Sequence, residues 1–184
     1  MTILNYTYVD NSNVFIEGQR VSAVRRGMAI DIYDAHDRGI FDFTWQLDYG
    51  VLHDIVCGQK SEIGAAKLWG SPPPGDTFWK MIETKGFKVK TYDKSPKGKE
   101  KKVDVAIAHE ITKDAYTVLA GKQSAVEITL AAGDKDFCPV VEDLRAQGFR
   151  VVVAFWGHAA KELRELASDF FCLDPHLNVL THTR

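Results

Sequence analysis

The sequence predicts an α/β protein, a three-layer α/β/α sandwich with a mostly parallel central sheet. Three observations lead to this prediction. Apolar runs at 127–132 and 149–155 suit strands that are buried on both faces of a parallel sheet. Segments with apolar residues at helical spacing separate the strand-like segments. A chain of 184 residues, 45% of them apolar, can bury one ordinary core, so we expect residues 1–184 to form a single domain.

The first half of the chain alternates between the two kinds of segment. Residues 5–9 alternate polar and apolar side chains and predict a strand, and the polar residues 10–13 can cap a helix over 14–24. Residues 25–43 have no clean period and predict a loop with a short helix. Helical spacing returns at 44–57, and residues 61–68 are weakly strand-like. A proline-rich loop then leads to a helix over 77–85, ended by Gly86, and to a strand over 87–92.

The second half begins with a basic loop at 93–102. Val103, Ile107 and Ile111 fall on one face of a helix predicted over 103–119. The strand at 127–132 follows, and a helix over 137–147 ends at Gly148. After the strand at 149–155 we expect a helix over 159–168 and a short strand over 170–173. The tail from about residue 175 is expected to be loosely held.

Composition excludes several classes of function. A net charge of −2 means that a nucleic-acid site would need a local basic patch. The basic loop offers one, and its lysines either form a solvated linker or contact phosphates; they are Lys94, Lys97, Lys99, Lys101 and Lys102. Neither a signal peptide nor a membrane-spanning run is visible, so we expect a cytoplasmic or otherwise intracellular protein with no membrane partner. The phosphate-binding glycine motifs are absent, so we expect no nucleotide cofactor.

Four aspartates are the candidate catalytic and metal-binding residues. Asp10, Asp134 and Asp136 follow predicted strands, and Asp104 lies in the first turn of a predicted helix. Each also has an ordinary structural explanation, as a helix cap, a turn residue or a partner of the helix dipole. If the four converge, a hard cation must offset their charge, and oxygen ligands favour Mg²⁺ or Mn²⁺. Such a site can hydrolyse phosphodiesters. The scattered histidines and three cysteines do not form a zinc pattern.

Three stretches together resemble a known family. Residues 8–18, 102–108 and 132–137 are similar, in order and spacing, to the three acidic motifs of the NYN domain family, a branch of the PIN-like nucleases. The resemblance extends from about residue 6 to 173. It implies a PIN-like fold and a metal-dependent ribonuclease in which Asp10, Asp104, Asp134 and Asp136 form the acidic cluster. It also implies that Asn11 and Asn13 orient that cluster or its metal-bound waters, that RNA is the partner, and that a homodimer is an option.

The sequence departs from the family pattern at several positions. Lys102 stands where glycine is common, and Glu110 where relatives often have aspartate. Lys135 replaces a small residue between two acids, so it either contacts substrate phosphate or pairs with an acid and weakens metal binding. The segment 27–43 is longer than the usual connection and is a candidate for shaping the substrate groove.

Two other functions compete with the ribonuclease. A non-catalytic RNA-binding or regulatory scaffold of the same fold would need the lysines but not the acids. A phosphatase with Asp10 as nucleophile ranks lower, because many such enzymes carry a second acid two residues later and this chain has Ser12 there. Among the tryptophans, which are usually core residues, Trp69 is the candidate for stacking on a base.

Overall fold

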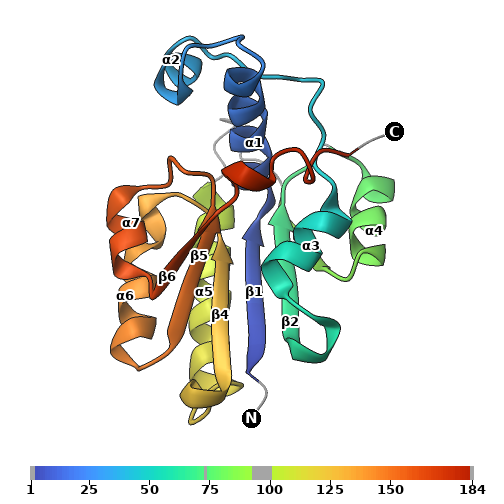
Figure 1. The fold of residues 1–184 in the computed structure, drawn as a ribbon. Helices are drawn as coiled ribbons and strands as arrows, with labels where there is room; N and C mark the ends of the chain where they lie inside the picture. Colours follow the sequence, from blue (N-terminus) through green and yellow to red (C-terminus); the bar gives the residue numbers. More distant parts are fainter. Residues whose placement is uncertain (1–2, 73, 93–100, 183–184) are drawn as a thin grey trace.

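The computed structural model describes residues 3–72, 74–92 and 101–182. Within these residues six strands form one sheet in the order β3-β2-β1-β4-β5-β6 (Figure 1). Every neighbouring pair is parallel, as the apolar runs predict. The strands are β1 (Leu4–Asp10), β2 (Ile63–Gly70), β3 (Lys88–Thr91), β4 (Val126–Ala131), β5 (Arg150–Phe155) and β6 (Asp169–Cys172).

Helices cover both faces of this sheet, which confirms the predicted α/β/α sandwich. They are α1 (Asn11–Arg25), α2 (Ile32–Asp37), α3 (Tyr49–Cys57), α4 (Asp76–Thr84), α5 (Lys101–Thr117), α6 (Cys138–Ala146) and α7 (Lys161–Leu166), with 3-10 turns η1 (Lys60–Glu62), η2 (Gln123–Ala125), η3 (Lys135–Phe137) and η4 (Asp174–His176). Two successive residues of β1 show the layering. The Thr7 hydroxyl donates to a carbonyl of α3, and the Tyr8 hydroxyl donates to Asp114 of α5 on the opposite face.

The order of the strands places a topological switch point at the carboxyl edge of the sheet. The chain moves from β1 outward to β2 and β3, then returns to the other side of β1 for β4. Connections therefore leave the carboxyl ends of β1 and β4 in opposite directions. Open α/β sheets bind their ligands at such a switch point. Here Asp10 ends β1, and Gly133 and Asp134 follow β4.

Two helices begin at other residues than the hydrophobic pattern predicts. Helix α1 starts at Asn11, three residues early, because the Asp10 carboxylate caps it directly by accepting from the Asn13 N–H. Helix α3 starts at Tyr49 rather than at residue 44, because Asp48 caps it by accepting from two backbone N–H groups. Residues 43–44 form a turn instead, and Leu47 forms an isolated bridge. The first two helices extend beyond the carboxyl edge of the sheet (Figure 1).

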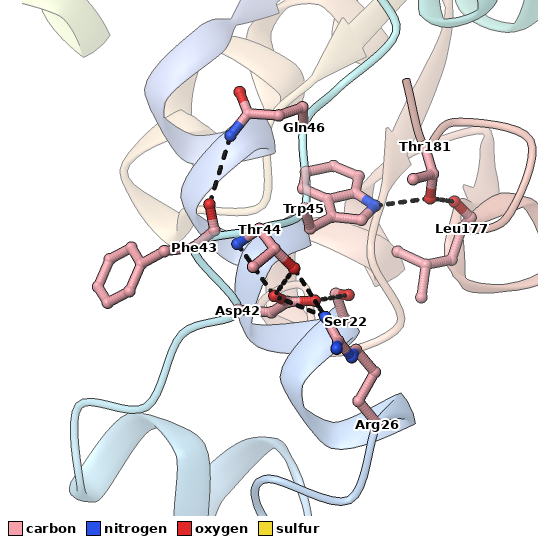
Figure 2. A network of polar contacts seen from close by, with 9 residues as sticks. All are labelled: Ser22, Arg26, Asp42, Phe43, Thr44, Trp45, Gln46, Leu177 and Thr181. Carbon is pink, nitrogen blue, oxygen red and sulfur yellow. Dashed lines mark hydrogen bonds and ion pairs between the residues drawn. The ribbon is translucent and has the colours of Figure 1, made fainter. Parts of the chain in front are cut away.

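The expectation of a loosely held tail is wrong for residues 175–182. Leu177 and Leu180 are buried in the core. The Trp45 indole N–H donates to the Thr181 hydroxyl, which donates to the Leu177 carbonyl (Figure 2). Thr181 also forms an antiparallel bridge with Leu47. The tail is therefore fixed against the segment that precedes α3. No helix in the described part of the chain is long and apolar enough to cross a membrane.

Candidate metal centre

Three of the predicted aspartates meet at the carboxyl edge of the sheet. Asp104, Asp134 and Asp136 each offer a carboxylate oxygen, and these oxygens all lie within 4.8 Å of one another. Asp104 comes from the first turn of α5, and the other two come from the turn after β4. Asp134 and Asp136 are exposed and Asp104 is partly buried, so solvent reaches the group.

The end of β4 is fixed by contacts of Gly133. Its N–H donates to the Asn13 side-chain oxygen at 2.8 Å, and its carbonyl accepts from the Ala160 N–H at 2.9 Å. A Cβ atom at this position would lie 2.1 Å from the Phe155 ring, so only glycine fits. The Asp134 carboxylate then accepts from the Asp136 N–H at 3.0 Å. These contacts hold both carboxylates in one tight turn.

A network of charges fixes α5, and with it Asp104. The Lys67 ammonium lies 2.8 Å from Glu110 and 2.5 Å from Asp114, and Lys90 lies 2.9 Å from Glu110. Burial raises the pKa of Glu110, but the hydrogen bonds from Lys67 and Lys90 outweigh burial and lower this pKa to about 2. The Tyr8 hydroxyl donates to Asp114 at 2.6 Å. Strands β1, β2 and β3 therefore all hold this helix.

Asp10 lies outside the group of three. Its side chain is buried at the end of β1, next to β4, and it caps α1. The cap explanation is therefore correct, and a role as ligand stays a prediction. Asn13 connects this corner to the metal centre through Gly133. Asn11 does not face that way, because its side-chain oxygen accepts from the Tyr49 hydroxyl of α3 at 2.7 Å.

The other predicted residues lie in different places. Glu110 is six residues beyond Asp104, about 9 Å along the helix, and belongs to the charge network rather than to the group of three. Lys94, Lys97 and Lys99 lie outside the described residues. Lys101 and Lys102 begin α5 instead of belonging to a loop. Lys135 is exposed between the two acids and borders a shallow depression of about 420 Å³.

Trp69 is not available to stack on a base. Its side chain is fully buried, with its ring centroid 6.1 Å from that of Tyr8. The Lys90 ammonium lies 5.4 Å from the Trp69 ring centroid. The candidate based on its position before the proline-rich loop is therefore wrong.

Sequence reasoning also missed residues that support the site. Lys67, Lys90 and Asp114 carry no motif, and only the alternation along β2 and β3 places the two lysines on the face that α5 covers. Glu110 and Asp114, four residues apart, lie on one face of α5 and meet those lysines. That i, i+4 pair of acids was the available signal.

The donor set is suited to a hard divalent cation. All three side chains offer carboxylate oxygens, the ligands that Mg²⁺ and Mn²⁺ prefer. Asp134 and Asp136 form no ion pair with any residue that the structure describes. Three like charges so close repel one another, and a cation would offset that repulsion.

Comparison with known proteins identifies the class. The family model of the NYN domain matches residues 11–174, so the chain belongs to this nuclease-like family. A crystal structure of a protein of unknown function from Vibrio parahaemolyticus has the same fold, with a TM-score of 0.60 and 18% sequence identity over 94% of each chain. A search of curated proteins found no match.

Proposed function

We propose that the protein is a divalent-metal-dependent ribonuclease that hydrolyses RNA phosphodiester bonds at Asp104, Asp134 and Asp136. The observation that carries this proposal is the convergence of the three carboxylates within 4.8 Å at the switch-point edge. Membership of a nuclease-like family supports it. Mg²⁺ or Mn²⁺ bound by the three carboxylates would supply an activated water and offset charge on the phosphate.

Other residues would support the three carboxylates. Asp10 adds a negative charge at the end of the neighbouring strand β1. It would either bind the metal directly or contact a water that is bound to the metal. Asn13 holds the turn that carries Asp134. Lys135 and the lysines of 94–102 would contact the RNA backbone, which is how such side chains usually contribute to affinity.

The test is cleavage of a labelled single-stranded RNA in EDTA, Mg²⁺ or Mn²⁺. We expect metal-dependent cleavage that falls at least about a hundredfold in Asp134→Asn and Asp104→Asn. The matched control is Asp54→Asn, because this carboxylate on α3 is 84% exposed and outside the group of three. Equal activity of the parent and Asp134→Asn proteins would refute the assignment.

A scaffold that binds RNA without cleaving it is the alternative. It predicts binding in EDTA that weakens with salt, with no turnover under any ion. A homodimer stays a prediction, and light scattering after size exclusion would measure it.

A further inference from the structure

A cavity of about 660 Å³ has Asn11 and Ser12 in its wall, directly before Asn13, which contacts Gly133 at the metal centre. Helices α1, α3 and α4 and the tail enclose it. Its wall includes Asn11, Ser12 and Phe15 of α1, Tyr49 of α3, and Phe78 and Met81 of α4. The volume falls in the usual range of ligand pockets, about 300–1,000 Å³.

We propose that this cavity, the base pocket, binds an unpaired nucleobase of an RNA whose backbone reaches the three carboxylates. The proposal rests on the proposed function for the identity of the ligand. It assigns a binding role to residues outside the acidic motifs.

The walls of the base pocket suit the faces of a base. Phe15 and Phe78 are partly buried and contribute aromatic rings, and the buried Tyr49 supports Phe78 edge to face with centroids 5.5 Å apart. The Tyr49 hydroxyl already donates to Asn11, and burial raises the pKa of Tyr49, so its ring stays neutral. Proteins that bind single strands use such rings as stacking surfaces.

Polar groups around the pocket suit the edge of a base. The Ser71 side chain is buried and lines the cavity. Lys85 and Gln46 also line it and are exposed. His182 is held there by Asp48, with 3.4 Å between the ring nitrogen and the carboxylate. Specific sites for RNA bases combine stacking with hydrogen bonds of this kind.

The base pocket and the metal centre share one short segment of chain. Asn11, Ser12, Phe15 and Ile16 recur at helical spacing along one side of α1 and face the pocket. Asn13 contacts Gly133 on the other side. A strand of RNA that crosses the start of α1 would therefore present a base to the pocket and a phosphate to the acids.

The pocket wall is formed before any ligand binds. Asp42 is buried and accepts hydrogen bonds from Ser22, Arg26 and Thr44, which fixes residues 42–45 against α1 (Figure 2). The next residues, Gln46–Tyr49, line the cavity and pair with the tail. Residues 46–49, which follow the long connection, line the cavity, whereas a role of segment 27–43 itself in shaping the substrate groove stays a prediction. A preformed pocket reduces the entropic cost of binding.

The experiment measures binding in EDTA, so that cleavage is not required. The ligand is a tetranucleotide RNA with one 2-aminopurine, whose fluorescence falls on stacking, and its partner is the same RNA with an abasic site. We expect Phe78→Leu to weaken binding of the aminopurine RNA about tenfold and to leave the abasic RNA unchanged. Ser71→Ala removes a hydroxyl from the cavity wall and should change the preference among the four bases. Lys80→Ala, on the same helix but not in the pocket, is the control.

The outcomes separate the two proposals. Equal affinity for the aminopurine and abasic RNAs would overturn the base pocket, whatever the cleavage assay shows. Pocket-dependent binding without cleavage would support the base pocket and refute the ribonuclease. If Phe78→Leu does not fold, an unchanged base preference in Ser71→Ala is sufficient to reject the inference.

Discussion

Asp10 serves the local structure whether or not it binds a metal. Its carboxylate caps α1 and is only 5% exposed, while its neighbours Asn11 and Asn13 contact opposite sides of the edge. The charge of this side chain and its capping role can be separated by substitution, because asparagine is as good a cap as aspartate.

Asp10→Asn should therefore keep the fold and lose activity. We expect the free energy of unfolding to change by less than about 1 kcal/mol, since the cap remains. Asp10→Ala should destabilise by about 1 kcal/mol more. Urea unfolding and cleavage assays on both variants measure this. Full activity in Asp10→Asn would show that Asp10 only caps α1 and that its charge is not needed for cleavage.

Asp42 should make stability depend on pH. Burial raises its pKa, but hydrogen bonds from Thr44, Ser22 and Arg26 outweigh burial and lower the pKa from 3.8 to about 2. The folded state therefore gains stability above pH 4 and loses it as pH falls toward 2. The loss is about 2 kcal/mol by linkage. Urea unfolding between pH 2 and 6 should show a flatter profile for Asp42→Asn, and parallel profiles would contradict this.

At the scale of elements, α5 connects the stability of the protein to its candidate site. The helix carries Asp104 at its start and the partners of Lys67 about two and three turns later. Lys67, Glu110 and Asp114 are each largely buried. Removing one member of such a network leaves the others uncompensated.

Lys67→Met should reveal this connection. The methionine keeps the apolar stem but leaves Glu110 and Asp114 without that cation, so we expect a loss of about 3 kcal/mol in the free energy of unfolding. Adding Asp114→Asn should recover part of the loss. Calorimetry with and without Mn²⁺ measures both the stability and the metal-induced shift. A wild-type melting temperature in Lys67→Met would show that the network contributes little.

The tail is the second element with a testable role. Leu180 is fully buried, whereas its neighbour Val179 is 58% exposed. Leu180→Ala should cost about 3 kcal/mol through lost burial and a residual cavity. Val179→Ala should change stability by less than about 0.5 kcal/mol. Thermal unfolding compares the two variants, and equal melting temperatures would mean that the tail is not part of the cooperative unit.

At the scale of the whole molecule, local patterns predicted the sheet but not the contacts between distant segments. The hydrophobic pattern of alternating strand-like and helical segments predicted all six strands. The position of acids at strand ends predicted the turn that carries Asp134 and Asp136. The wall of the base pocket was not predictable, because Leu47 meets Thr181 across 134 positions and neither residue has a motif. The prediction that Trp69 stacks on a base was wrong for the same reason, because the burial of Trp69 depends on contacts with the distant residues Tyr8 and Lys90.

The position of the docked tail affects the choice of the chain end to which an affinity tag is attached. The final described residues lie beside the base pocket, whereas β1 begins at the opposite end of the sheet (Figure 1). An affinity tag attached to the carboxyl side of this tail would follow His182 closely and compete with a ligand, and a polyhistidine tag would also bring metal-binding groups there. A tag on the amino-terminal side of β1 would be attached at the other end of the sheet, so amino-terminal fusions are the suitable form for every assay above.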